Sequence, residues 1–295
     1  GRRVGIASNS HKAVDNLLAE CGKVLREKGR DLKGLKVSGD RNEELHRDNP
    51  NLEFVEKNKN AARSFRGGVV GGTAWLFARA DWIDSLDFLF IDEAGQVSLA
   101  NAVAMAPSAR SLVMLGDQMQ LEQPNQGSHP GDSGLSSLQY ALKDLTDSKP
   151  DAPVFQPVVP SDYGIFLGES RRMHPAICGF ISESIYEGRL SAHPSCERQA
   201  VDIAPTAVHV TKPNGISFIN VEHDGNTQRS DEEAARVRAV YDELIGRPFT
   251  DRDGVVRPLG LNDFLFVAPY NAQVRALQET LPKGARIGSV DKFQG

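Results

Sequence analysis

Cysteines and long apolar stretches are both scarce in this sequence. Its 295 residues contain only 3 cysteines, and this odd, widely spaced set (Cys21, Cys178, Cys196) favours neither a disulfide framework nor a zinc site. The longest nearly uncharged apolar stretch, Leu99 to Pro107, is much shorter than the ~20 residues that a membrane span needs. No basic start leads into a signal-like apolar segment. We therefore expect a cytoplasmic protein that has no membrane partner.

An excess of positive charge is also absent. The 34 Lys and Arg residues against 39 Asp and Glu give a net charge of -5, which argues against nucleic acid as a partner because phosphates favour basic surfaces. This average hides an asymmetry, since residues 1–70 hold 15 basic and 10 acidic residues, a balance of +5 that leaves -10 for the rest. A local basic face and a solvated surface of mixed charge both fit this distribution.

What is present is an alternation of short apolar stretches with helical patterns. Residues 4–7, 88–91 and 112–115 are short apolar runs, each followed by a helical pattern or a Gly/Pro-rich loop. Runs of this kind are typical of strands that are buried on both faces of a parallel sheet. The first half of the chain is therefore predicted to be an α/β domain.

A proline-rich polar stretch divides the chain. We predict three parts, which are a first domain at 1–149, a linker at 150–163 and a second domain at 164–295. The second domain is also predicted to be α/β, with mainly parallel strands, because the alternation resumes after the linker. Its predicted helices are 175–188, burying Ile177, Phe180, Ile181 and Ile185, then 231–244 after a Ser230 and Glu233 capping box, and 271–281. Its predicted strands are 217–221, 264–268 and 287–290.

Two adjacent carboxylates follow the apolar run at 88–91. Asp92 and Glu93 stand where open α/β sheets place their ligands, at the carboxyl end of a strand. Asp92 is predicted to hold Mg²⁺, and Glu93 to orient and deprotonate an attacking water. An ordinary strand end that carries two solvated acids is the alternative.

A second polar turn follows the apolar run at 112–115. Gly116 and Asp117 form a tight turn, and Gln120 offers both a donor and an acceptor without charge, which suits a residue that senses a terminal phosphate. A simple turn is the alternative for these residues, although two such sheet edges together favour a site.

These residues resemble the motifs of superfamily 1B helicases, the branch that includes the helicase of nonsense-mediated decay and the helicase part of the Okazaki-fragment helicase-nuclease. The similarity extends over nearly the whole chain, in family order. The similar segments are 4–18 (motif Ia), 71–74 (motif Ic), 92–95 (motif II), 116–121 (motif III), 172–188 (motif IV), 268–273 (the segment after it) and 289–295 (the start of motif V).

The resemblance implies two tandem RecA-like domains that bind and hydrolyse ATP with Mg²⁺. Arg172 is implied to reach the terminal phosphate from the second domain, a role that suits the planar, always charged guanidinium. Arg171 departs from the family pattern, because relatives often carry an aromatic residue there that stacks on the nucleotide base, although a guanidinium plane can also stack. The nucleotide contacts carried over from the family are Asp117, Arg171, Gln273, Gln294 and Gly295.

Single-stranded nucleic acid is the partner that the resemblance implies, with DNA favoured over RNA. The strand is expected to lie across the tops of both sheets, held by amides and hydroxyls on phosphates and by aromatic or proline faces on sugars and bases. The positions carried over for this role are Ser10, Thr73, Pro269, Tyr270 and Asp291. A cap or packing role is the alternative for these positions, and Ser10 in particular has the features of an N-cap.

A G-x-x-x-x-G-K-[ST] phosphate loop is absent from the sequence. The nearest glycine cluster, Gly67 to Thr73, lacks the lysine and falls where motif Ic belongs. The chain also stops inside motif V, so we expect that both ends were removed from a longer protein. The segment 7–14 is similar to bacterial proteins in which such a motor is fused to a RecB-like nuclease domain, although no nuclease centre is encoded here.

Three functions stay open at this point. The first is an ATP-driven helicase or translocase, inactive as this chain alone. The second is a helicase-like module that binds nucleic acid or a partner without hydrolysis. The third is an ATP-dependent signalling switch whose ATPase does not respond to single strands.

Overall fold

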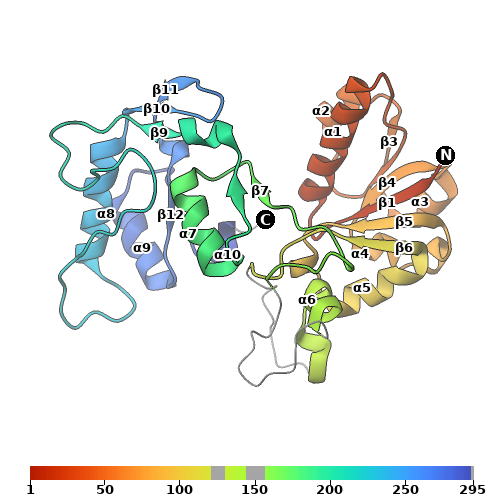
Figure 1. The fold of residues 1–295 in the computed structure, drawn as a ribbon. Coiled ribbons are helices and arrows are strands. Elements are labelled where there is room, and N and C mark those ends of the chain that lie inside the picture. Colours follow the sequence, from red (N-terminus) through yellow and green to blue (C-terminus); the bar gives the residue numbers. More distant parts are fainter. Residues whose placement is uncertain (121–129, 144–156, 294–295) are drawn as a thin grey trace. The chain divides into compact units, whose positions relative to one another are not determined.

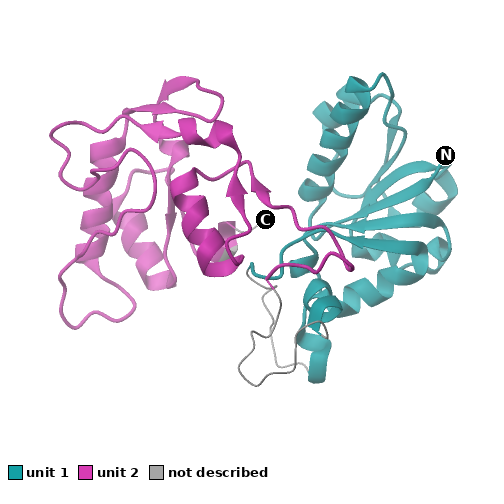
Figure 2. Ribbon diagram, in the orientation of Figure 1, with its two compact units in different colours: residues 1–156 teal, residues 157–295 magenta. Residues whose placement is uncertain are grey.

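The computed structural model describes residues 1–120, 130–143 and 157–293 (Figure 1). The chain divides into two compact units, residues 1–156 and 157–295 (Figure 2). The division falls inside the predicted linker, 150–163, of which the part up to residue 156 lies outside the described residues. Among the helices that the structure describes, none is both long and apolar enough to cross a membrane. The two units are described separately below.

Unit 1 is built around six strands. They are β1 (Arg3–Ala7), β2 (Gly34–Val37), β3 (Leu52–Val55), β4 (Gly68–Gly72), β5 (Leu86–Ile91) and β6 (Ala109–Met114). The α-helices are α1 (His11–Glu27), α2 (Glu43–Asp48), α3 (Asn58–Ser64), α4 (Ala74–Phe77), α5 (Leu99–Met105) and α6 (Ser137–Leu142). Short 3-10 helices are η1 (Ala80–Trp82), η2 (Ala94–Gln96), η3 (Ala106–Ser108) and η4 (Gly131–Gly134).

The six strands form one sheet in the order β3-β2-β4-β1-β5-β6, and every pairing in it is parallel. This confirms the predicted α/β class and is consistent with a RecA-like domain. In the register of the sheet, Ala7 of β1 pairs with Gly72 of β4 on one side and with Ile91 of β5 on the other. The carboxyl ends of β4, β1 and β5 therefore meet at the same edge, and Figure 1 shows these strands side by side.

Helix α1 lies close to the sheet because β4 has a glycine, Gly71, where it faces the helix. A Cβ atom added to Gly71 would lie 2.7 Å from the Val14 side chain and 2.8 Å from that of Leu18, both of which are fully buried. Ser10 caps the helix, since its hydroxyl accepts the N–H of Ala13 at 3.1 Å. The N-cap that was the alternative role of Ser10 is therefore present, and its predicted contact with a strand stays a prediction.

Unit 2 contains shorter elements. Its strands are β7 (Glu169–Ser170), β8 (Ser191–Ala192), β9 (Ala200–Val201), β10 (Pro248–Thr250), β11 (Val256–Pro258), β12 (Leu265–Val267) and β13 (Arg286–Gly288). Its α-helices are α7 (Pro175–Ile185), α8 (Asp231–Leu244), α9 (Asn271–Thr280) and α10 (Val290–Phe293), with 3-10 helices η6 (Pro194–Arg198) and η7 (Leu261–Asp263).

The core of unit 2 lies between α8, α9 and a pair of parallel strands. Strand β12, helix α9 and strand β13 form a parallel β-α-β unit. The ring of Tyr241, which belongs to α8, packs against the rings of Phe264 and Phe266. Strands β7 and β8 form a second parallel pair. The remaining sheet, β11-β10-β9, is antiparallel. Parallel pairing is thus continuous in unit 1 and is divided among short pairs in unit 2.

Two predictions for unit 2 are wrong. Residues 217–221 form no strand, and Phe218 within them is 90% exposed. A β-prone segment stays irregular when no strand edge pairs with it, because β-propensity depends on packing and pairing. On α7 the predicted buried position Phe180 is exposed, whereas Cys178 and Ser182, one helical turn apart, are the buried positions.

Candidate functional site

The two predicted catalytic carboxylates follow β5 at the carboxyl edge of the unit 1 sheet. The backbone there is fixed by both neighbouring strands. The N–H of Asp92 donates to the carbonyl of Ala7 at 2.8 Å, and the N–H of Ala94 donates to the carbonyl of Leu115 at 2.8 Å. The segment that carries Asp92 and Glu93 is therefore held by hydrogen bonds to the ends of β1 and β6.

Two glycines let this segment touch the turn that follows β6. A Cβ atom on Gly95 would lie 2.4 Å from the backbone oxygen of Asp117, and one on Gly116 would lie 2.8 Å from the backbone nitrogen of Ala94. Both contacts are backbone to backbone, so no flexible side chain can move to make room. The residues predicted as two separate polar turns are thereby brought into direct contact.

Glu93 has an unusual backbone conformation for a residue that is not glycine. Its φ angle is +53° and its ψ angle is 42°, which is the left-handed helical region. A side chain with a Cβ atom is disfavoured there by about 1 kcal/mol or more. Strain of this kind persists where the surrounding structure fixes the chain, and it occurs often at functional sites.

Asp92 has the properties of a cation ligand. Burial raises the pKa of its carboxyl, and the backbone N–H of Glu93 offsets part of that rise. No ion pair of Asp92 occurs among the described residues. A partly desolvated carboxylate that lacks a cation fits Mg²⁺, which often uses one protein carboxylate together with phosphate oxygens and waters.

The described residues contain no cluster of three or more His, Cys, Asp or Glu side chains that could hold a metal by themselves. This finding does not conflict with the Mg²⁺ prediction, because Mg²⁺ at phosphate sites rarely needs an all-protein set of ligands.

Asp117 and Gln120 are linked to each other in the turn after β6. The Asp117 carboxylate accepts the backbone N–H of Met119 at 2.9 Å and the side-chain amide of Gln120 at 3.1 Å. Gln120 is exposed, and it would have to exchange this partner for a phosphate oxygen to act as a sensor.

Sequence reasoning missed the side chains that support this edge. The hydroxyl of Ser137 at the start of α6 donates to the carbonyl of Ala94 at 2.9 Å, and the amide of Asn9 donates to the carbonyl of Gln96 at 3.0 Å. A signal was present, because Ser136 and Gln139 form a capping box that starts α6. That pattern predicts a helix start, although it does not say what the start touches.

Arg171 and Arg172 in unit 2 follow the two-residue strand β7. The Arg171 guanidinium bonds to Glu169 at 3.1 Å, and its carbonyl accepts the Arg252 guanidinium at 2.9 Å. The carbonyl of Arg172 accepts the Gln199 amide at 3.3 Å, whereas its exposed guanidinium forms no ion pair among the described residues. The backbone of both arginines is thus held in place, and the guanidinium group of Arg172 is the one that is available for another partner.

Gln273 is placed where both atoms of its side-chain amide are already used. Its oxygen accepts the N–H of Ser230 at 2.7 Å, and its nitrogen donates to the carbonyl of Ser230 at 3.0 Å. The side chain is 8% exposed. Half of the capping box predicted at Ser230 is present, because the N–H of Glu233 donates to the Ser230 hydroxyl. The N–H of Ser230 donates to the side chain of Gln273 and not to that of Glu233. The nucleotide role of Gln273 stays a prediction.

The predicted strand-contact residues lie after strand ends. Thr73 precedes α4 after β4 and makes no capping bond with its side chain, and the exposed residues Pro269 and Tyr270 follow β12. Asp291 lies in α10, and the predicted nucleotide contacts Gln294 and Gly295 are outside the described residues. These roles also stay predictions.

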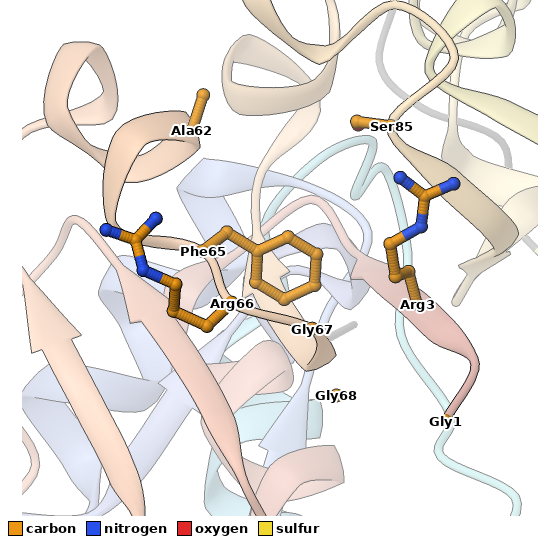
Figure 3. Close-up of a pocket in the computed structure, with 8 residues that line it drawn as sticks. All are labelled: Gly1, Arg3, Ala62, Phe65, Arg66, Gly67, Gly68 and Ser85. Atoms are coloured by element: carbon orange, nitrogen blue, oxygen red, sulfur yellow. The ribbon is translucent and has the colours of Figure 1, made fainter.

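A cavity of about 460 Å³ lies at the opposite edge of the unit 1 sheet (Figure 3). Its lining includes Arg3 at the start of β1 and Gly68 at the start of β4, and the guanidinium groups of Arg3 and Arg66 lie on either side of Phe65. None of the predicted site residues lines it. The edge that carries Asp92 and Glu93 is therefore separate from this cavity.

Comparison with known proteins finds a family model and several relatives that are similar to this chain. A family model described as an AAA domain matches residues 154–295. The chain is 25% identical over 224 residues to DNA-binding protein SMUBP-2 of Rattus norvegicus, covering 72% of this chain and 20% of the relative. It is 22% identical over 321 residues to DNA replication ATP-dependent helicase/nuclease JHS1 of Arabidopsis thaliana, covering 100% of this chain and 22% of the relative.

A SMUBP-2 protein of Mesocricetus auratus is 28% identical over 213 residues, which cover 71% of this chain and 20% of the relative. The chain thus spans about a fifth of the length of these curated relatives. The chain is thus similar to an AAA-domain family over residues 154–295, and to relatives whose names describe a DNA-binding protein and a DNA replication helicase/nuclease.

Proposed function

We propose that this chain carries most of the motor of an ATP-dependent helicase or translocase that moves on single-stranded nucleic acid, with DNA favoured over RNA. The observation that carries the proposal is the carboxyl edge of the unit 1 sheet, where the Asp92 and Glu93 segment contacts the Asp117 turn through its backbone. Open α/β sheets bind their ligands at this edge. The names of the relatives, a DNA-binding protein and a DNA replication helicase/nuclease, support DNA as the partner.

The two carboxylates take different roles in this proposal. Asp92 would hold Mg²⁺, which would neutralise phosphate charge. Burial raises the pKa of the Asp92 carboxyl, and a bound cation would favour its charged form. Glu93 orients the attacking water and accepts its proton as general base. The fixed backbone of the segment keeps the two carboxylates in these separate positions.

Gln120 and Arg172 respond to the terminal phosphate. Gln120 exchanges its bond to Asp117 for a bond to a phosphate oxygen, which links the turn after β6 to the state of the nucleotide. Arg172 supplies a planar, permanently charged donor from unit 2 to the phosphoryl group in transfer. Arg171 is committed to Glu169 and is proposed to contact the base only by exchanging that partner.

Residues 1–295 contain no G-x-x-x-x-G-K-[ST] segment to cradle phosphates. Asp92 and Glu93 by themselves present negative charge to a polyanion. We therefore expect this chain alone to bind Mg-ATP weakly and to lack measurable turnover, while it binds single strands weakly and in a salt-sensitive manner. The complete protein is proposed to be cytoplasmic and to include a RecB-like nuclease domain, a fusion that the helicase/nuclease name of one relative supports.

The test is ATP hydrolysis by the full-length protein that contains this chain, measured without nucleic acid and with added single-stranded DNA or RNA. Turnover that increases with single-stranded DNA is the expected result. The same assay and a calorimetric titration with Mg-ATP are applied to residues 1–295. Micromolar affinity together with strand-stimulated turnover in residues 1–295 would contradict the expectation for this chain.

Two other outcomes would identify the alternative functions. Turnover that is unchanged by added strands would indicate an ATP-dependent signalling switch. Strand binding without any hydrolysis by the full-length protein would indicate a non-hydrolysing binding module.

A further inference from the structure

Helix α4 holds its largest apolar side chain in solvent. Trp75 is 79% exposed, whereas the next two residues, Leu76 and Phe77, are 0% and 1% exposed. The other tryptophan of the chain, Trp82, is 0% exposed. Isolated exposed apolar residues are common on protein surfaces, so the meaning of Trp75 depends on where it lies.

Trp75 lies at the carboxyl edge of the unit 1 sheet. It comes three residues after Gly72, the last residue of β4, and Gly72 pairs with Ala7, the last residue of β1. The segments that leave these two strands therefore start about 5 Å apart, the spacing of neighbouring strands. One segment carries Thr73 and Trp75, and the other carries Ser10.

The segment after β1 adds a positive charge to this edge. Lys12, in the first turn of α1, is exposed and forms no ion pair among the described residues. Trp75, the hydroxyls of Thr73 and Ser10, and the unpaired cation of Lys12 thus lie on the two segments that leave adjacent strands at this edge. Surfaces that bind single strands without sequence preference combine these groups, since cations contact the backbone and aromatic rings stack on bases.

The helix beneath Trp75 is well anchored. The N–H of Leu76 donates to the carbonyl of Thr73 at 2.9 Å, and the Phe77 ring packs edge-on against Trp82 with centroids 5.8 Å apart. The backbone of Trp75 is therefore held before any partner binds. A ring presented from a fixed backbone loses little conformational entropy when a flat partner stacks on it.

We propose that Trp75 stacks on a base of the bound single strand and so forms a sequence-tolerant contact at this edge. The inference rests on the proposed function, because it names a base contact within that strand-binding surface. Thr73, Ser10 and Lys12 bind the flanking phosphates.

The test uses the whole chain, residues 1–295, and a short fluorescent oligothymidylate, whose binding is measured by anisotropy. Trp75→Ala is expected to weaken binding by about tenfold or more, and Trp75→Phe by less, because one stacked base makes a contribution of this size. The matched control is Ile83→Ala. Ile83 is 57% exposed and lies two residues before the serine that precedes β5, at the opposite edge of the sheet, so its removal is expected to leave binding unchanged.

Intrinsic fluorescence gives an independent measurement. Unlabelled oligothymidylate should quench the emission of the exposed Trp75, and the quenching should disappear in Trp75→Phe, where only the buried Trp82 remains. Strand binding that is equal in wild type and Trp75→Ala, without quenching in the wild type, would overturn the stacking proposal and leave the proposed function standing. A wild-type chain that binds no single strand even at low salt would overturn the strand-binding expectation for this chain and the stacking proposal with it.

Discussion

In unit 1 the candidate carboxylates follow a strand that has partners on both sides, whereas in unit 2 Arg172 follows a strand of only two residues. The segment with Asp92 and Glu93 is fixed by backbone hydrogen bonds and by the backbone contact of Gly95 with Asp117. The backbone of Arg172 is fixed by a side chain, the amide of Gln199. Position is thus set by the sheet in one unit and by side-chain contacts in the other.

The same contrast holds away from the candidate residues. In unit 2, the Glu243 carboxylate accepts the backbone N–H groups of residues 208, 209 and 210, and Asp263 accepts the Arg257 guanidinium and the N–H of Gly260. Unit 2 therefore depends on individual side chains to hold loops that have no strand partner. Substitutions of side chains should disturb unit 2 locally, whereas added backbone volume should disturb the site of unit 1.

The largest effect is expected at Arg172, which tests whether unit 2 contributes to the chemistry. Arg172→Lys should be nearly as damaging as Arg172→Ala, with a loss of ~10³-fold or more in ATP turnover of the full-length protein, because lysine lacks the planar fork. ADP affinity should change little. Arg275→Lys, an exposed change on α9, serves as the control. Equal weakening of ADP and ATP binding would show that Arg172 has a structural role instead.

Glu93 tests the contribution of unit 1. Glu93→Gln should reduce ATP turnover of the full-length protein by ~10²-fold or more, since a positioned general base is lost. Mg-ATP binding should stay within a few fold, because Asp92 is unchanged. Single-turnover hydrolysis and equilibrium binding separate these two quantities. Turnover within a few fold of wild type would remove Glu93 from the catalytic role.

Gly95 tests the backbone contact. Gly95→Ala places a methyl group against the Asp117 carbonyl and should lower the free energy of unfolding of unit 1 by about 1–3 kcal/mol. Tryptophan emission in urea follows this unit, because both tryptophans, Trp75 and Trp82, lie in it. Gly179→Ala in α7 of unit 2 is the control, because an added Cβ there meets nothing within 4 Å, and it should leave the tryptophan transition of unit 1 unchanged. An unaffected urea midpoint in Gly95→Ala would mean that the two turns separate without cost.

The smallest effect is expected at Asp263, whose pKa is lowered from 3.8 to about 2 chiefly by the Arg257 guanidinium. A lowered pKa stabilises the folded state above pH 4 and loses that contribution as the pH falls toward 2. Asp263→Asn should therefore destabilise unit 2 by about 1 kcal/mol at pH 7, a figure reduced for solvent screening. Far-UV circular dichroism in urea measures it, and a difference from wild type that is independent of pH between 7 and 3 would exclude this linkage.

How much the sequence predicts differs between local and non-local features. The strand before Asp92, the turn at Gly116 and the Ser230 cap are encoded in short patterns, and all three are present. The strands β2, β3 and β4 were not predicted. Strand β4 is Gly-Val-Val-Gly-Gly, whose three glycines lower its β-propensity, and Gly71 among them makes room for α1. The segment 217–221 is the opposite case, because it has β-prone residues but forms no strand where no strand edge pairs with it.

The candidate site shows the same limit. Asp92, Glu93 and Gln120 were found from strand ends, which are local features. Three other features of the site join residues that are far apart in sequence. They are the contact of Gly95 with Asp117, the hydrogen bond from Ser137 to Ala94, and the two hydrogen bonds between Gln273 and Ser230. Short-range patterns do not encode such distances, so these features come only from the folded chain.

The left-handed backbone of Glu93 has a consequence for laboratory evolution. Glycine or asparagine adopts this conformation with less steric cost than glutamate. A library of this protein selected only for heat resistance should therefore enrich glycine or asparagine at position 93, whereas selection for growth that depends on ATP turnover should restore glutamate. The two selections would favour different residues at position 93, because the backbone conformation that positions the carboxylate also destabilises the folded state when the residue is glutamate.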